Sequence, residues 1–179
     1  MKPQSPPMPT LRATRTMLVA QSRIDSPLGP ITLAATAHGL ALAWFDGQQH
    51  RTETVDAPTE PAHPLLQQAE REFTAYWADA RSPVAVPLDP QGTPFQRAVW
   101  QVLRGIAPGR PISYSDVAQG IHNPAAVRAV GAAIGRNPLG IIVPCHRVLG
   151  RDGSLTGYAG GLHRKEALLR HESLQAALA

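Results

Sequence analysis

Cysteine is almost absent from this chain, because Cys145 is the single cysteine among 179 residues. One cysteine cannot form an internal disulfide, and it cannot supply a cysteine-rich zinc site. The sequence also lacks an apolar run long enough to span a membrane, and residues 1–16 lack the continuous apolar segment of a secretory signal. These absences predict a soluble, cytoplasmic protein without a metal centre, whose residues 1–16 form a disordered tail.

Acidic side chains are scarce in the second half of the chain. A turn-rich linker, residues 89–92, separates two predicted domains at 17–91 and 92–179. Residues 1–91 hold 7 Lys and Arg against 9 Asp and Glu, a net charge of −2, whereas residues 92–179 hold 10 against 4, a net charge of +6. Such an excess favours a polyanion partner such as nucleic acid, although many basic domains bind nothing in particular.

The first half has the pattern of a small sheet with one helix. Residues 18–24, 31–37 and 40–45 are predicted strands, and the turns between them indicate an antiparallel meander. Apolar residues at helical spacing predict a helix over residues 64–77, and residues 84–88 are a candidate last strand.

The second half is predicted to be mainly helical. Thr93, with proline next and Gln96 three residues later, predicts a capped helix that runs to about Ile106. Further helices are predicted from Ser113 to Gly120, from a cap at Asn123-Pro124 to Arg136, and over residues 161–171, where Leu162, Leu168 and Leu169 are apolar. The two short helices suggest a helix-turn-helix, so the whole chain is an α+β protein: an N-terminal α/β domain followed by a helical, winged helix-turn-helix-like domain.

The helix before Arg136 has two contrasting faces at 100° per residue. Val127, Val130 and Ile134 form an apolar stripe, and Arg128 lies well away from it. The outer face otherwise consists of small residues: Ala125, Gly131, Ala132 and Gly135. Small residues can simply allow tight helix packing, but together with the basic charge they favour close approach to DNA, with one long arginine projecting.

The segment that holds candidate reactive residues is Ile141–Val148. In it, an apolar, strand-like run ends at proline and is followed by Cys145, His146 and Arg147. A nearby base or positive charge lowers the pKa of a thiol and makes the reactive thiolate available. A buried, inert thiol is the alternative and the usual state of a single cysteine. Neighbours in a strand also point to opposite faces, unless the turn after Pro144 breaks that alternation.

A histidine that acts as a base needs an acid to orient it, and Glu172 is a candidate. It follows Leu168 and Leu169 by four and three residues and so flanks the buried face of the last helix. From spacing alone, an exposed glutamate near a helix end is the favoured interpretation.

The Pro144–Val148 motif resembles the active-site motif of the O6-alkylguanine-DNA alkyltransferases. Further blocks match that family in order and spacing, so that the resemblance covers residues 92–173, and the first half resembles the family's N-terminal α/β domain more loosely. The matching blocks are Tyr114, Arg128–Gly131, Asn137-Pro138, Gly157–Gly161 and Arg164 to Glu172.

The resemblance implies a role for each residue around Cys145. Cys145 would accept the alkyl group, His146 would deprotonate it through a water, and Glu172 would orient His146. Asn137 would stabilise the turn before the cysteine. Tyr114 would help to rotate the nucleotide and donate a hydrogen bond to the leaving guanine.

The resemblance also implies direct repair of double-stranded DNA that carries O6-alkylguanine. Arg128, with Ala129, Gly131 and Ala132 beside it, would approach the minor groove and fill the gap left by the flipped base. The guanine pocket would be formed by Ile134, Val148, Tyr158 and Ala159.

The reaction implied by the resemblance uses no cofactor and consumes the protein. Because an S-alkylcysteine is a stable thioether, we expect each molecule to turn over once. We also expect the protein to be a monomer. Activity on O4-alkylthymine stays open.

Two positions depart from some relatives: Ala159 replaces a serine, and Gly140 stands where some have proline. Both leave the substrate range open.

Two other functions fit parts of the pattern. A non-enzymatic DNA-binding regulator or lesion sensor would use the same basic helix-turn-helix, but it would not require the Cys-His-Glu set. A cysteine hydrolase would use Cys145 and His146 in multiple turnovers, but it would not explain the basic face.

Overall fold

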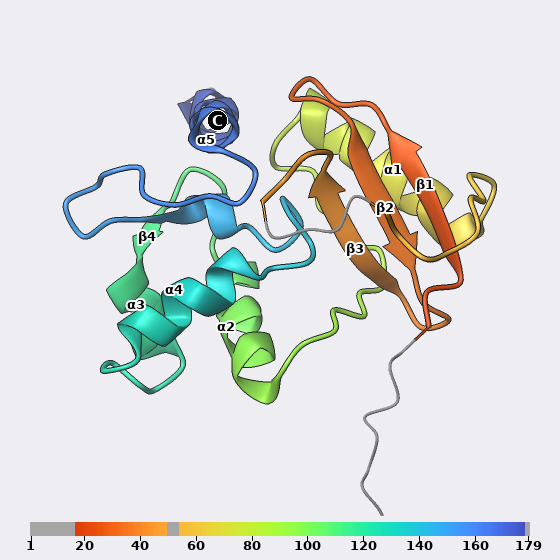
Figure 1. Ribbon diagram of the computed structural model, residues 1–179. Coiled ribbons are helices and arrows are strands. Elements are labelled where there is room, and N and C mark those ends of the chain that lie inside the picture. The colour runs from red at the N-terminus through yellow and green to blue at the C-terminus, as the bar shows by residue number, and fades with distance from the viewer. Residues whose placement is uncertain (1–16, 50–53, 178–179) are drawn as a thin grey trace, which may run out of the picture.

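The computed structural model describes residues 17–49 and 54–177. The predicted disordered tail, residues 1–16, lies outside the described residues. Figure 1 shows a three-stranded sheet with one helix behind it, a cluster of short helices beside the sheet, and a long C-terminal helix. The predicted α+β class is confirmed.

The sheet is an antiparallel meander of β1 (Ala20–Ile24), β2 (Ile31–Ala35) and β3 (Leu40–Phe45). Ile24 pairs with Ile31, and Ile31 pairs with Phe45, so side chains of one face line up across all three strands. Helix α1 (Pro64–Ala78) covers that face with four buried residues: Leu66, Ala69, Phe73 and Tyr76. The three strands and the helix were predicted, with β1 and β2 each two residues shorter than expected.

The candidate strand at residues 84–88 is wrong. Only Leu88 forms a bridge, to Leu40. The backbone N–H groups of Ala85 and Val86 instead donate to the carboxylate of Glu72, at 2.7 and 2.8 Å. The start of this segment is therefore tied to a side chain of α1, and only its end is bonded to β3, at Leu40.

Three short helices form the core of the second half. They are α2 (Pro94–Arg104), α3 (Tyr114–Gly120) and α4 (Val127–Gly135). The capping box of Thr93 and Gln96 is confirmed, and Ser113 and Asp116 form a second one at the start of α3. The indole N–H of Trp100 on α2 donates to Ala133 on α4 at 2.9 Å, which joins these two helices.

The start of α4 differs from the prediction. Asn123-Pro124 was expected to cap this helix, but the N-cap is Ala126, with no side-chain cap, and the first helical residue is Val127. The N–H of Ala126 donates to the Asn123 carbonyl at 3.0 Å, so the predicted cap forms a turn before the helix. Ala125 consequently lies outside α4.

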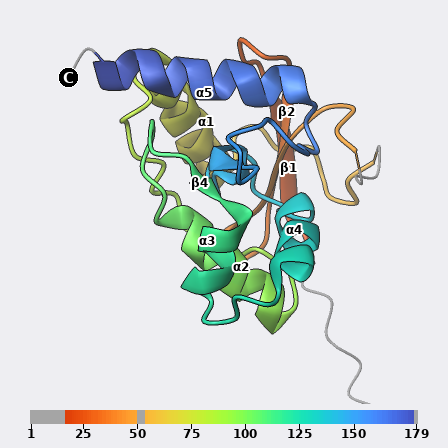
Figure 2. The ribbon, with the colours of Figure 1, turned by 90° about the vertical axis from the view of Figure 1, so that its left-hand side faces the viewer.

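The C-terminal helix α5 (Leu162–Ala177) lies across the top of both halves, above α1 and the active-site segment (Figure 2). It extends beyond His171, where the predicted helix ended. Leu168 is fully buried, but Leu162 was expected on the apolar face and is 47% exposed. The first residue of a helix is free to point outward, which its apolar character alone does not reveal.

The two halves are joined by backbone contacts at one edge of the sheet. Ala43 on β3 forms a parallel bridge with Leu139, its N–H donates to Pro138 at 2.9 Å, and its carbonyl accepts from Gly140 at 2.7 Å. Gly140 thus uses an N–H that a proline would lack. The sheet edge therefore holds the segment that leads to Cys145.

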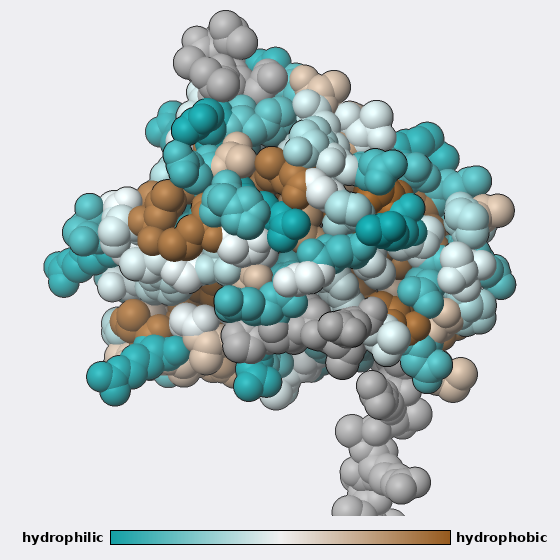
Figure 3. Space-filling view, turned by 45° about the horizontal axis from the view of Figure 1, so that its top comes forward, coloured by the Kyte–Doolittle hydropathy of each residue, from teal (hydrophilic) through white to brown (hydrophobic). Residues whose placement is uncertain are grey.

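The molecular surface is mainly hydrophilic on the face shown in Figure 3, where hydrophobic residues gather in small patches. None of the helices in the described part of the chain has the length and apolar character needed to cross a membrane.

Candidate active site

Cys145 opens a single 3₁₀ turn, η1 (Cys145–Arg147), which is followed by the short strand β5 (Val148–Leu149). Strand β5 pairs in parallel with β4 (Ile112–Ser113). The predicted strand-like run before the cysteine is wrong: residues 141–143 form turns, and Ile141 has a φ of +70°. Since η1 is not extended, Cys145 and His146 are freed from the alternation of a strand.

Asn137 is buried and stabilises the segment that leads to Cys145. Its side-chain amide nitrogen lies 3.2 Å from the Cys145 sulfur and donates to the Val143 carbonyl at 2.7 Å. Its side-chain oxygen accepts from the Leu139 N–H at 2.9 Å. One residue therefore fixes the polypeptide at Leu139 and Val143, the two ends of the segment before Cys145, and contacts the sulfur.

His146 and Glu172 meet in the interior, and both side chains are 0% exposed. Nε2 of His146 lies 2.7 Å from Oε1 of Glu172. A carboxylate only accepts, so Nε2 carries the hydrogen, and in the neutral ring the lone pair is on Nδ1. Among the described residues, Nδ1 has no hydrogen-bond partner.

Burial lowers the pKa of His146, and the positive charges of Arg147 and Lys165 lower it further, although Glu172 opposes them. The ring is therefore neutral near pH 7, with the free lone pair of a base.

The exposed position favoured for Glu172 from spacing is wrong. The carboxylate accepts hydrogen bonds from Nε and Nη2 of Arg147 at 2.9 and 2.8 Å, in addition to the contact with His146. Burial alone would raise its pKa, but the hydrogen bonds from His146 and Arg147 outweigh burial and lower the pKa to about 2. Glu172 is thus a buried acid that is ionised near pH 7.

Lys165 is a polar residue of this region to which the sequence assigned no role. Its fully buried ammonium group donates to the carbonyls of Val148, Thr156 and Gly157 at 2.6, 2.8 and 3.3 Å. Burial lowers its pKa to about 8. Lys165 belongs to a matched sequence block, which was the available signal, and it ties the strand after the cysteine to residues 156–157.

A cavity of about 170 Å³ opens beside Cys145. Three of the residues predicted for the guanine pocket line it, Ile134, Tyr158 and Ala159, together with Tyr114 and with Gly131 of the predicted DNA-facing surface. Val148 is not among the described residues that line it. The tyrosine hydroxyl of Tyr114 donates to the Thr156 carbonyl at 3.1 Å, and burial raises the pKa of Tyr158.

The cavity has a lining that the sequence did not predict. Gln48 and Gln49, which follow β3 in the first half, lie on its wall, and the Gln49 N–H donates to the Ala159 carbonyl at 3.0 Å. Polar residues in a loop gave no signal of this position.

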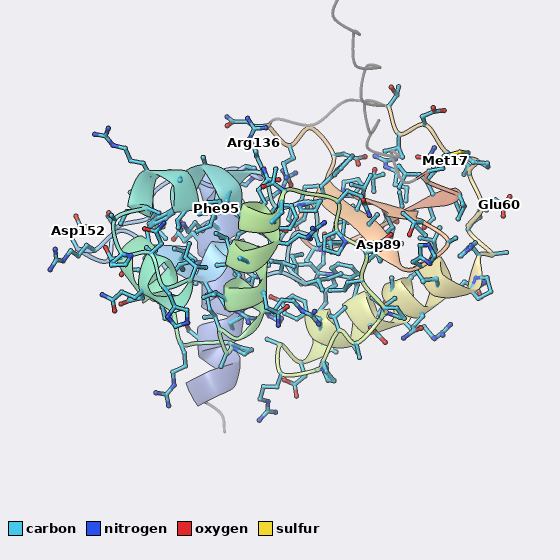
Figure 4. The ribbon with its side chains drawn as sticks, turned by 90° about the horizontal axis from the view of Figure 1, so that it is seen from below. Met17, Glu60, Asp89, Phe95, Arg136 and Asp152 are labelled. Carbon is cyan, nitrogen blue, oxygen red and sulfur yellow. The ribbon has the colours of Figure 1, made fainter. Side chains whose placement is uncertain are left out.

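The outer face of α4 has the predicted character. Arg128, Ala129 and Ala132 are exposed, and Gly131 is partly exposed. Figure 4 shows Arg136 at the C-terminal end of α4, between the helices and the sheet, with Asp152 at the far edge of the helical half. Val130 and Ile134 are buried on the opposite side.

Within the described ranges, no group of three or more His, Cys, Asp or Glu side chains could hold a metal ion.

Known proteins resemble this chain over most of its length. The model for the 6-O-methylguanine DNA methyltransferase, ribonuclease-like domain, matches residues 19–90, and the model for the DNA binding domain of the same protein matches residues 94–174. The methylated-DNA–protein-cysteine methyltransferase of Methanosarcina acetivorans is 45% identical over 148 residues, which cover 83% of this chain and 94% of that protein. The chain belongs to the 6-O-methylguanine DNA methyltransferase family.

Other members of the family agree in sequence and structure. The methylated-DNA–protein-cysteine methyltransferase of Mycobacterium bovis is 44% identical over 86% of this chain and 92% of its own. The crystal structure of Mycobacterium tuberculosis OGT in complex with DNA superposes with a TM-score of 0.81 at 43% identity, covering 88% of this chain and 94% of the other. These matches confirm the resemblance inferred from the motifs.

Proposed function

We propose that this protein repairs DNA by transferring the alkyl group of O6-alkylguanine to Cys145 in a single turnover. The observation that carries the proposal is the position of the Cys145 sulfur beside a small cavity, immediately before a buried histidine bonded to an ionised acid. Membership of a family whose members are named methylated-DNA–protein-cysteine methyltransferases supports the same reaction.

The chemistry is a displacement at the alkyl carbon. The sulfur of Cys145 forms a bond to that carbon, the bond from the carbon to guanine O6 breaks, and its electron pair stays with the guanine. His146 accepts the thiol proton through a water, using the lone pair on Nδ1, and Glu172 stabilises the resulting imidazolium. Tyr114 donates a hydrogen bond as guanine leaves.

The product is an S-alkylcysteine, and Cys145 is the only cysteine. No second thiol in the chain can regenerate it, so each molecule acts once. Asn137, which contacts the sulfur, holds the turn through this change.

Duplex DNA is the proposed partner, approached from the minor groove by α4. Ala129, Gly131 and Ala132 allow the helix to come close, and Arg128 fills the stack after the damaged nucleotide is flipped out. The base then enters the cavity, where Ile134, Tyr158, Ala159 and the backbone at Val148 would surround it. The excess positive charge of residues 92–179 supports this partner, and we propose a cytoplasmic monomer.

Incubation with duplex DNA that carries labelled O6-methylguanine tests the proposal. We expect label on Cys145 at no more than one equivalent, and we expect Cys145→Ser to lose transfer and retain DNA binding. Repeated turnover would indicate a hydrolase instead. Binding of the lesion without transfer by the fully reduced protein would indicate a lesion sensor.

A further inference from the structure

A tyrosine from the first half of the chain reaches the acid behind His146. The hydroxyl of Tyr76, on α1, donates to Oε1 of Glu172 at 2.9 Å across a sequence separation of 96 residues. Tyr76 is 2% exposed and Glu172 is 0% exposed, so water does not compete with this bond.

The oxygen that Tyr76 contacts is the one that contacts His146. Oε1 of Glu172 lies 2.7 Å from Nε2 of His146, 2.8 Å from Nη2 of Arg147 and 2.9 Å from the Tyr76 hydroxyl. Each donor draws on the same negative charge. Because hydrogen bonds to a carboxylate stabilise its charge, every additional donor leaves less of it to stabilise a protonated His146.

The phenol is fixed in place and stays protonated. Its ring makes edge contacts with Trp77 and His171 at centroid distances of 5.1 and 5.3 Å, and Nε2 of His171 lies 3.0 Å from the Tyr76 carbonyl oxygen. Burial, and next the charge of Glu172, raise the pKa of Tyr76 above its ordinary value. Tyr76 is therefore a donor over the whole range in which the protein works.

We infer that Tyr76 is a positioning residue for alkyl transfer: its hydroxyl holds the Glu172 carboxylate and limits the basicity that Glu172 confers on His146. The inference rests on the proposed role of His146 as the base for Cys145. With this role for Tyr76, helix α1 of the first half contributes a residue to the active site as well as to the hydrophobic core.

Burial has the largest effect on the proton affinity of His146, and three charged groups modify it. Arg147 in η1 and Lys165 on α5 oppose protonation of the ring, and Glu172 on α5 favours it. Tyr76 on α1 acts through Glu172, the charged group that favours the protonated ring. Its hydrogen bond reduces the negative charge that Glu172 offers to His146.

Replacement of the hydroxyl tests the inference without a change of shape. In Tyr76→Phe, the carboxylate directs more charge to His146, so we expect the pKa of His146 to rise by about half a pH unit, equivalent to a threefold change in proton affinity. The measurements are a ¹⁵N NMR titration of the His146 ring and the pH profile of transfer from O6-methylguanine, whose acidic limb moves to higher pH. Thr74→Ala, which removes an exposed hydroxyl from the same helix, should leave both unchanged.

A second arm keeps the test decisive if Tyr76→Phe does not fold. Incorporation of 3-fluorotyrosine at position 76 gives a stronger donor, and the titration of His146 should then move to lower pH. An unchanged titration in the fluorinated protein, or in folded Tyr76→Phe, would overturn the inference and leave Tyr76 a structural residue. The NMR titration does not depend on transfer, so a wild-type protein without transfer activity would refute the proposed function separately.

Discussion

The side-chain amide of Asn137 contacts both the sulfur of Cys145, at 3.2 Å, and the carbonyl oxygen of Val143, at 2.7 Å. Two groups separated by one residue, Pro144, are thus held by the same nitrogen. The position of the thiol therefore depends on a turn whose start is held by the edge of β3 and whose end is held by this buried side chain.

Asn137→Ala should therefore lose both stability and transfer. Because the substitution removes the acceptor of the buried Leu139 N–H and one of the two donors to the Val143 carbonyl, we expect the free energy of unfolding to fall by about 1–3 kcal/mol. Urea denaturation checks the stability, and single-turnover transfer to Cys145 checks the chemistry. Asn123→Ala, at an exposed asparagine before α4, is the matched control and should change neither.

Arg128→Ala separates insertion into the base stack from general attraction to DNA. Extrusion of a base costs a few kcal/mol, so loss of the inserted side chain should slow transfer by about tenfold or more. Binding of undamaged duplex should weaken only as expected for one lost charge, with the salt dependence reduced by about one ion. Arg71→Ala, an exposed arginine on α1, should affect neither. Equal losses of transfer and nonspecific binding in Arg128→Ala would contradict the insertion.

Glu172 should make the protein sensitive to acid. Its pKa is about 2 in the folded protein, below the ordinary value of 4.5, so its contribution to stability is fully present above pH 4.5 and is lost as the pH falls towards 2. The difference corresponds to a contribution on the order of 3 kcal/mol. Urea denaturation between pH 5 and pH 2.5 should show this loss in the wild type.

The comparison with two variants assigns that acid sensitivity to one carboxylate. Glu172→Gln should be less stable at pH 5 and should lose much less stability on further acidification. Glu166→Gln, an exposed carboxylate on the same helix, should retain the wild-type profile. A wild-type profile in Glu172→Gln would assign the effect elsewhere.

Lys165→Met should loosen the residues around the cavity. The three carbonyls that Lys165 contacts, at Val148, Thr156 and Gly157, would lose their shared donor. We expect faster hydrogen exchange over residues 148–158 and a slower transfer reaction, measured on the same sample. Arg170→Met removes an exposed charge from α5 and should preserve the wild-type exchange pattern.

Local signals in the sequence predicted the elements of this fold. Turn residues between apolar segments placed the three strands, and the Thr93 and Gln96 pair placed the start of α2, because these features act within a few residues of each other. These local signals gave a wrong prediction at residues 84–88, where the backbone N–H groups of Ala85 and Val86 donate to the carboxylate of Glu72 on α1.

The site was predictable mainly through the family resemblance. Spacing alone placed Glu172 on an exposed flank, because the helical pattern cannot show which other segments surround a helix end. Tyr76 and Gln49 gave no signal for the same reason: their partners, Glu172 and Ala159, lie about a hundred residues away. The division of the chain into domains after Gln91 stays a prediction.

The bridge between Ala43 and Leu139 affects how this protein unfolds. Contacts at the sheet edge and between Tyr76 and Glu172 stabilise each half only while the other is folded. Heat or denaturant should consequently melt the chain in one transition rather than two. A protease that cut the linker at residues 89–92 would sever the polypeptide without releasing two independent proteins.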